Sequence, residues 1–222
     1  WLFLDVAVFG RYNHNAWHIL ESIGAAPIVT KEDQEILSQG TCDYIAFNYY
    51  NTMTVASYFE KDNNIDQQSG FGIPGFFQSV ENTHLQMTEF GWPIDPKGFR
   101  FTLNEIYSRY HLPLLITENG IGANDILTDD GAVHDQYRID YLKEHIEQMA
   151  LAMADGVEVI GYCPWSAIDL VSTHEGMKKR YGFIYVNRTD EDLLDLARYK
   201  KDSFYWYQEL ISKNEIEESD DN

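Results

Sequence analysis

The sequence has few basic residues, few cysteines and no long apolar run. Only 16 Lys and Arg residues stand against 36 Asp and Glu residues, which gives a formal net charge of -20. Because nucleic-acid binding needs a basic surface that holds phosphates, this balance argues against a nucleic-acid partner. No run of about 18 apolar residues and no signal-peptide pattern is present, so we expect neither a membrane span nor secretion.

Cys42 and Cys163 are the two cysteines, and both lie in apolar stretches. We expect them to be buried thiols rather than a disulfide or a metal pair, which suits a reducing cytoplasm. We also expect no metal ion and no cofactor. The sequence begins at Trp1 instead of Met, which favours a piece of a longer protein.

Apolar periodicity and helix-start signals predict an alternation of helices and strands. The predicted helices cover residues 13–23, 30–40, 99–110, 135–155 and 199–213, and the predicted strands cover residues 43–50, 114–116 and 157–170. Residues 51–98 show no clear periodicity and predict a long loop, and the acidic residues 215–221 predict a solvated end. This α/β order is typical of parallel βα units, and three strands are too few for a closed barrel of about 250 residues.

Polar or aromatic residues end all three predicted strands. Asn48 and Tyr50 lie at the carboxyl end of the first strand, Glu118 follows the second and Trp165 lies toward the end of the third, so in a parallel sheet they share one rim. We predict that residues 114–116 form a strand buried on both faces, which makes an ionised Glu118 at its end costly unless it is satisfied. Taken alone, Glu118 is either a catalytic carboxylate or the partner of a nearby Arg or Lys, and Asn48 and Tyr50 either line a site or satisfy local backbone.

Several segments in the same order closely resemble family 1 of the glycoside hydrolases, the retaining β-glycosidases. These segments are Phe47-Asn48-Tyr49-Tyr50, Gly91-Trp92-Pro93-Ile94-Asp95-Pro96, Ile116-Thr117-Glu118-Asn119-Gly120 and Trp165-Ser166-Ala167-Ile168-Asp169. The resemblance implies that residues 1–222 are the C-terminal portion of a single (β/α)8 TIM barrel domain, about its last three βα units. The N-terminal half of that barrel would then be absent from this sequence and would be its missing partner.

The resemblance also implies roles for individual residues. Glu118 matches the catalytic nucleophile, which forms a glycosyl-enzyme intermediate. Tyr50 matches a tyrosine that donates a hydrogen bond to the nucleophile and keeps it ionised. Asn48 lies at the same rim, and Trp165 matches an aromatic platform for the sugar. The acid and base carboxyl of this family follows an Asn in an Asn-Glu-Pro motif, which does not occur here.

The residues after Trp165 indicate a phosphorylated substrate. Family members that act on plain sugars generally carry Glu-Trp seven residues later, where this sequence has Ser172-Thr173. Loss of that carboxylate makes room for an anion, and a basic cluster of Lys178, Lys179 and Arg180 follows. The cluster is either an ordinary basic turn or a phosphate site.

The spacing of Ser172, Lys179 and Tyr181 resembles the phosphate site of the 6-phospho-β-glycosidases. Galacto-specific relatives carry a Trp where this sequence has Thr173, so we expect a 6-phospho-β-glucosidase that hydrolyses phosphorylated β-glucosides in the bacterial cytoplasm. The alternatives are a 6-phospho-β-galactosidase, a plain β-glucosidase, and a non-catalytic half-barrel that binds sugar phosphate. We expect the chain alone to be inactive, because the acid and base carboxyl is missing. We also expect it to self-associate, as a homo-oligomer or an aggregate, because its sheet edges would be unpaired.

Overall fold

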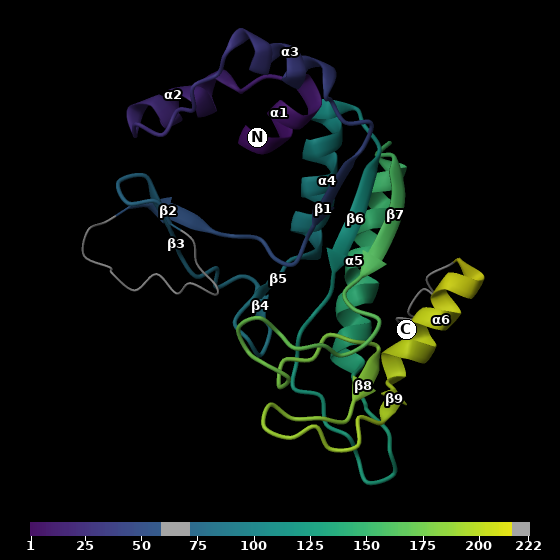
Figure 1. Ribbon diagram of the computed structural model, residues 1–222. Helices are drawn as coiled ribbons and strands as arrows, with labels where there is room; N and C mark the ends of the chain where they lie inside the picture. The colour runs from purple at the N-terminus through teal and green to yellow at the C-terminus, as the bar shows by residue number, and fades with distance from the viewer. Residues whose placement is uncertain (59–71, 215–222) are drawn as a thin grey trace.

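The computed structural model describes residues 1–58 and 72–214, which form six helices and nine strands (Figure 1). The helices are α1 (Leu2–Phe9), α2 (His14–Ser22), α3 (Lys31–Gln39), α4 (Pro96–Tyr110), α5 (Gln136–Ala154) and α6 (Asp202–Lys213). The strands are β1 (Ile45–Asn48), β2 (Val55–Ser57), β3 (Phe77–Ser79), β4 (Gln86–Met87), β5 (Pro93–Ile94), β6 (Leu114–Asn119), β7 (Val159–Pro164), β8 (Ile184–Val186) and β9 (Arg198–Lys200). Within these ranges, each helix is too short or too polar to cross a membrane.

A parallel sheet of three strands in the order β1-β6-β7 is the centre of the fold. Helices α4 and α5 lie against one face of it, and α6 lies beside α5 (Figure 1). The carboxyl ends of the three strands point the same way, toward the loops that carry β8 and β9. The predicted α/β alternation is therefore confirmed, with strands 45–48, 114–119 and 159–164.

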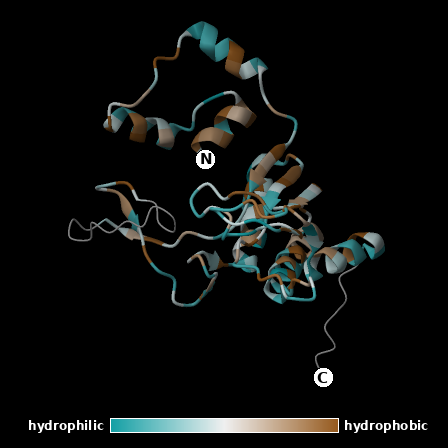
Figure 2. Ribbon diagram, turned by 60° about the horizontal axis from the view of Figure 1, so that its bottom comes forward, coloured by the Kyte–Doolittle hydropathy of each residue, from teal (hydrophilic) through white to brown (hydrophobic). Residues whose placement is uncertain are grey.

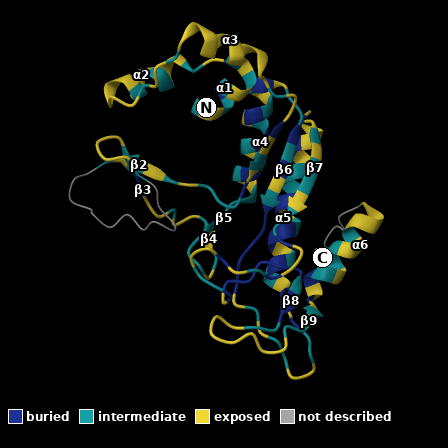
Figure 3. Cartoon of the chain, in the orientation of Figure 1, coloured by how far each residue is buried: buried dark blue, intermediate teal, exposed yellow. Residues whose placement is uncertain are grey.

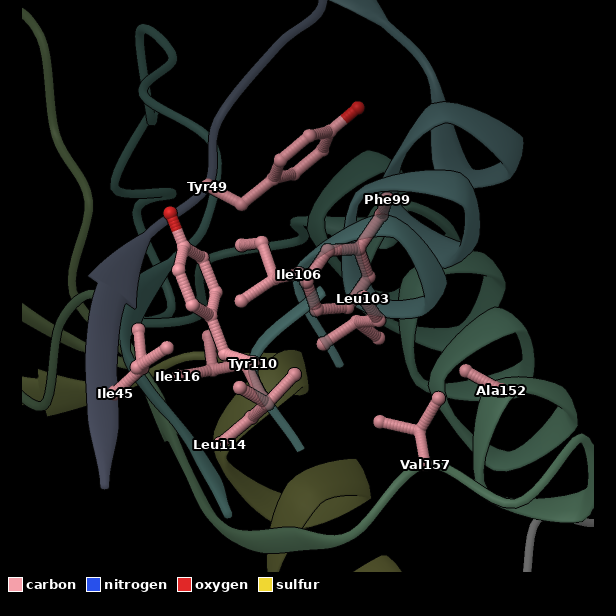
Figure 4. Packing of buried hydrophobic residues seen from close by; sticks show 10 residues of the cluster. All are labelled: Ile45, Tyr49, Phe99, Leu103, Ile106, Tyr110, Leu114, Ile116, Ala152 and Val157. Carbon is pink, nitrogen blue, oxygen red and sulfur yellow. The ribbon is translucent and has the colours of Figure 1, made fainter. Parts of the chain in front are cut away.

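The core lies between β6 and α4. Leu114 and Ile116 of β6 are fully buried and pack with Phe99 and Leu103, which lie on the apolar face of α4 (Figure 4). On the opposite face of the sheet Leu115 is only half-buried and Thr117 is exposed. The prediction that this strand is buried on both faces is therefore wrong, because no helix of the described ranges covers the second face.

Local signals set the helix ends. Helix α3 begins with a capping box, since the Thr30 hydroxyl accepts from the Asp33 backbone N–H and the Asp33 carboxylate accepts from the Thr30 backbone N–H. Helix α4 begins at Pro96, three residues before the predicted start, because proline suits the first turn and Asp95 accepts a hydrogen bond from the Gly98 backbone N–H at 2.8 Å. Helix α6 begins at Asp202, since residues 198–200 pair with β8 instead.

The region predicted as one long loop contains four short strands. Strands β2 and β3 form one antiparallel pair, and β4 and β5 form another. The prediction of a loop over residues 51–98 is wrong at these strands, because elements of two or three residues are too short to show periodicity. Residues 59–71 of that region and the acidic residues 215–221 lie outside the described residues.

Both cysteines are free, with Cys163 exposed and Cys42 half-buried. The prediction of two buried thiols is wrong for Cys163. That residue belongs to β7, an edge strand of the three-stranded sheet, and neighbouring strands expose Ala46 and Thr117. An apolar run thus predicts a strand correctly, but it does not tell whether another layer covers both faces of that strand.

Candidate active site

The register of the sheet brings the predicted rim residues together. Asn48 at the end of β1 pairs with Glu118 of β6, and Asn119 pairs with Pro164 at the end of β7. Trp165 follows directly, and its backbone N–H donates to the Asn119 carbonyl at 2.8 Å. The three strand ends therefore form one contiguous rim.

Glu118 is half-buried and has one strong hydrogen-bond donor beside it. The Tyr50 hydroxyl donates to Oε2 of Glu118 at 2.5 Å. Burial is the main cause that raises the pKa of Tyr50, and the hydrogen bond and charge of Glu118 raise it further. Among the described residues, no Arg or Lys forms an ion pair with Glu118, so the alternative of a simple strand-end ion pair is not observed there.

Asn48 and Asn119 differ in what they contact. Asn48 is exposed, and its side-chain oxygen accepts a hydrogen bond from the Thr117 hydroxyl at 2.7 Å. Asn119 is fully buried and its side chain bonds to the Tyr49 carbonyl, the Tyr141 hydroxyl and the Tyr162 hydroxyl. Asn119, directly after Glu118, therefore links the end of β6 to the residue after β1, to β7 and to α5.

Gly120 allows the ends of β6 and β7 to approach closely. A Cβ atom at Gly120 would lie 2.1 Å from the Trp165 carbonyl oxygen, which is far inside contact distance. A larger residue would push the Trp165 backbone away from the end of β6, so only glycine fits at this position of the Thr-Glu-Asn-Gly motif.

Lys179 is a buried cation without a carboxylate partner among the described residues. Its side chain lies over aromatic rings, with Nζ 3.8 Å from the ring centroid of Trp92 and 4.7 Å from that of Phe90. Only 3% of the residue is exposed, and burial lowers the pKa of its ammonium. Cation–π contacts hold the ammonium in place without neutralising its charge.

Ser172 and Tyr181 lie in the same cluster as Lys179. Lys179 Nζ is 5.7 Å from the ring centroid of Tyr181. Burial raises the pKa of Tyr181, while a hydrogen bond with Ser172 opposes that rise. Tyr181 therefore lies against both the Ser172 hydroxyl and the Lys179 ammonium, and the role of the three groups in binding phosphate stays a prediction.

The other members of the predicted basic cluster point elsewhere. Lys178 is exposed and forms an ion pair with Glu175 at 2.8 Å, and Arg180 is buried against Asp169 at 2.9 Å. Lys178 and Arg180 are therefore each paired with a carboxylate, whereas Lys179 contacts aromatic rings. Thr173 is exposed, and no contact of it with the cluster is observed among the described residues.

Steric contacts join the Lys179 cluster to the segment that leaves Glu118. A Cβ atom at Gly122 would lie 2.7 Å from the Lys179 side chain and 2.8 Å from the Tyr181 ring. The Ala123 and Arg180 backbones exchange two hydrogen bonds. Tyr181 is also close enough to Tyr50 to raise the pKa of Tyr50. The cluster and Glu118 consequently share one rim.

Sequence reasoning did not assign Phe90 and Trp92 to the site. Trp92 contacts both parts of it, because its ring packs edge-on against Tyr50 at 5.5 Å and lies under Lys179. The one signal in the sequence was that Trp92 belongs to Gly91-Trp92-Pro93-Ile94-Asp95-Pro96, a segment that resembles the family. Within residues 1–58 and 72–214 no group of three or more His, Cys, Asp or Glu is arranged to hold a metal ion.

The motifs at this rim agree with a comparison to known families. The model of Glycosyl hydrolase family 1 matches residues 1–216. The chain belongs to glycosyl hydrolase family 1. The family resemblance inferred from the sequence is therefore confirmed.

Individual relatives of this family 1 chain are phospho-β-glucosidases. It is 46% identical over 220 residues to the aryl-phospho-beta-D-glucosidase BglC of Bacillus subtilis (strain 168), a match that covers 95% of this chain and 46% of BglC. It is 48% identical over 216 residues to BglA of the same organism, covering 96% of this chain and 44% of BglA. The chain thus spans about half the length of the curated relatives it matches.

A solved structure of the family has the same arrangement. The family 1 β-glucosidase from Thermotoga maritima superposes with a TM-score of 0.79 at 34% identity, covering 98% of this chain and 44% of that chain.

Proposed function

We propose that this chain carries the nucleophile and the phosphate-binding residues of a retaining 6-phospho-β-glucosidase. The observation that carries the proposal is the shared rim: the Tyr50–Glu118 pair lies beside a buried ammonium, Lys179, that has no carboxylate partner among the described residues. The names of BglC and BglA, both aryl-phospho-beta-D-glucosidases, support the same substrate class.

Glu118 performs the covalent step in this proposal. One carboxylate oxygen attacks the anomeric carbon and forms a glycosyl-enzyme while the aglycone departs with a proton from a second carboxyl group. Water then attacks the same carbon, that second group takes the proton, and the sugar leaves with retained configuration. Tyr50 donates to Oε2 of Glu118 and so orients the carboxylate. Trp165 and Asn48, at the neighbouring strand ends, contact the sugar.

Ser172, Lys179 and Tyr181 hold the 6-phosphate. A phosphate would be the first direct ionic partner of Lys179 among the described residues, because Glu175 forms its ion pair with Lys178 and acts on Lys179 only by raising its pKa; this favours a phosphorylated sugar over a plain one. Ser172 removes the repulsion that a carboxylate would exert there. Thr173, which replaces the Trp of galacto-specific relatives, supports glucose 6-phosphate as the product.

The second carboxyl group must come from outside residues 1–222, and we propose that these residues are the C-terminal portion of a (β/α)8 barrel. In the described chain β1 and β7 are the edges of the sheet. An apolar groove of about 490 Å³ between α5 and α6, lined by Met149, Met153 and Tyr207 among others, is open beside β7. Unpaired edges and open apolar surface support a further half that closes the sheet.

The first experiment completes the barrel. The N-terminal part of BglC, up to its matched segment, is fused to residues 1–222, and this fusion is called the completed barrel below. We expect it to hydrolyse p-nitrophenyl 6-phospho-β-glucoside, whereas the 222-residue chain alone turns over negligibly and self-associates in gel filtration. Robust turnover by the chain alone, or a folded completed barrel without any glucosidase activity, would contradict the proposal.

The second experiment tests phosphate recognition. In the completed barrel, Lys179→Ala should lower the preference for the phosphorylated over the plain aryl glucoside by roughly 10- to 100-fold, as expected for one charged hydrogen bond. Lys178→Ala is the matched control, because Lys178 pairs with Glu175 on the surface. An unchanged preference in Lys179→Ala would indicate a plain β-glucosidase, and faster turnover of the 6-phosphogalactoside would indicate the galacto enzyme.

A further inference from the structure

The segment that carries the proposed phosphate-binding residues presents two faces. Lys179 and Tyr181 lie toward Trp92 and Gly122. The residues between and after them, Arg180 and Gly182, contact Asp169 instead. This alternation is what an extended backbone imposes, so the orientation of one face fixes the orientation of the other.

Asp169 is the residue on which the second face converges. Its Oδ2 accepts hydrogen bonds from Arg180 Nη1 at 2.9 Å and from the Val186 backbone N–H at 3.3 Å. Its Oδ1 accepts from the Gly182 backbone N–H at 2.9 Å and from Lys201 Nζ at 2.7 Å. With only 6% of the residue exposed, one buried carboxylate satisfies four donors from three parts of the chain.

Gly182 packs directly against the backbone of Asp169. A Cβ atom at Gly182 would be 2.2 Å from the Asp169 backbone nitrogen. The segment therefore cannot be displaced toward Asp169, and the hydrogen bond from Gly182 prevents displacement away from it.

Arg180 makes further hydrogen bonds that restrain its neighbours, Lys179 and Tyr181. Its guanidinium also donates to the Val186 carbonyl at 2.9 Å and to the Arg188 carbonyl at 2.6 Å. Its backbone N–H donates to the Ala123 carbonyl at 2.9 Å. Both the guanidinium and the backbone N–H of Arg180 therefore hold the backbone between Lys179 and Tyr181 in place.

We infer that Asp169 is a positioning residue for phosphate recognition, acting through Arg180 and Gly182 on the neighbouring Lys179 and Tyr181. The inference rests on the proposed function, since it gives a role to residues that hold the fixed geometry of that site. Among the described residues, the Asp169 carboxylate contacts Arg180, Gly182, Val186 and Lys201, and not Glu118. A phosphate site needs its donors fixed before the ligand arrives, and a buried carboxylate with four donors supplies that rigidity.

The test uses the completed barrel with two variants. Asp169→Asn removes the charge that holds Arg180, and Arg180→Lys keeps a cation beside Asp169 but loses the bonds to the Val186 and Arg188 carbonyls. The matched control is Asp5→Asn, since Asp5 is also a buried carboxylate, 2% exposed, paired with an arginine at 2.7 Å, but far along the chain in α1. The measured quantity is the ratio of kcat/KM for the 6-phosphorylated and plain p-nitrophenyl β-glucosides, with the thermal midpoint recorded for each variant.

We expect the ratio to fall about tenfold in Asp169→Asn and in Arg180→Lys, and to stay within about twofold of the parent in Asp5→Asn even if all three lower the thermal midpoint. A residue that only stabilises the fold would change both substrates equally. If Asp169→Asn does not fold, Arg180→Lys decides the question alone.

A ratio within about twofold of the parent in the folded variants would overturn the inference. The Lys179→Ala variant separates the two failures. If Lys179→Ala also leaves the ratio unchanged, the proposed phosphate site itself is wrong, whereas a collapse of the ratio in Lys179→Ala alone contradicts only the role of Asp169.

Discussion

Charged residues are buried at the carboxyl end of the central sheet, whereas apolar residues are exposed in the helices that precede it. At the carboxyl end Arg138, Lys201 and Asp169 are buried and each has an ionic partner. In contrast, α2 and α3 bury no residue at all. Figure 3 shows this difference as dark α4 and α5 against mostly yellow α2 and α3.

The exposed helices carry apolar side chains that find no cover within the described chain. Phe3 is 84% exposed and Ile36, on the predicted apolar face of α3, is 62% exposed. Figure 2 shows the hydrophobic stretches on these helices. The proposed site is therefore built from contacts inside this chain, while the amino-terminal helices present surface suited to a further layer.

The largest expected difference between the two ends of the sheet is in catalysis. In the completed barrel, Glu118→Gln should lower kcat by about 10³-fold or more, because the amide cannot form the glycosyl ester. Glu158→Gln, an exposed carboxyl just before the amino end of β7, is the control and should leave kcat unchanged. Steady-state kinetics on the phosphorylated aryl glucoside measure both. Retention of more than about a tenth of kcat in Glu118→Gln would remove it as nucleophile.

The buried ions of the carboxyl end should dominate stability. Arg138 pairs with Asp125 and Asp135 and donates to the Ile121 carbonyl, so Arg138→Met should lower the free energy of unfolding by about 3–5 kcal/mol. Arg100 pairs with Asp155 on the surface, and Arg100→Met should cost about 0–1 kcal/mol. Urea denaturation of the completed barrel compares them. If the two variants lose the same free energy of unfolding, burial of an ion pair does not determine how much it contributes to stability.

His145 of α5 makes the packed part of the molecule sensitive to acid. Burial lowers the pKa of His145 from its ordinary value of 6.5 to about 4. Between these two pH values His145 is protonated in the unfolded state and neutral in the folded state. Stability should therefore fall as the pH drops from 6.5 toward 4, by about 2 kcal/mol from this residue by pH 5. His145→Gln should remove that share of the pH dependence, which urea denaturation at pH 7 and pH 5 can measure. The same pH dependence in both proteins would rule out this role.

The smallest effect is expected in the exposed amino-terminal helices. Phe3→Ser in the 222-residue chain should change the free energy of unfolding by less than about 0.5 kcal/mol, because the side chain is already in water. Phe99→Ala, at a fully buried position, is the contrasting variant, with an expected loss of about 3–5 kcal/mol. A cost above about 1 kcal/mol for Phe3→Ser would mean that α1 is packed against another chain in solution.

Much of the fold could be predicted from local patterns. The apolar spacing that places Leu103 and Ile106 on one face of α4, and the capping residues Thr30 and Asp33, act over a few residues and are visible in the sequence. The paired strands β2 to β5 were missed, because pairing between such short segments depends on contacts with distant residues. Cys163 was misjudged for the same reason, since its exposure depends on which neighbours cover its strand.

The candidate site divides in a similar way. Motif order singled out Tyr50 and Glu118 as candidates, and the structure joins them by a hydrogen bond across 68 residues of sequence, while their catalytic roles stay predictions. The resemblance also points to Ser172, Lys179 and Tyr181 as a phosphate site, and this role stays a prediction. The resemblance singled out Lys179 from its two basic neighbours, but nothing in the sequence placed Phe90 and Trp92 beside it.

The sequence by itself determined the family, the order of helices and strands, and which residue types end each strand, because motifs and apolar periodicity are local properties of the chain. Among the described residues, only the tertiary structure decided which of three neighbouring cations, Lys178, Lys179 and Arg180, forms no ion pair. Glu175 and Asp169 neutralise Lys178 and Arg180. Lys179 points to the opposite side of the extended segment, where distant loops supply aromatic rings in place of a carboxylate.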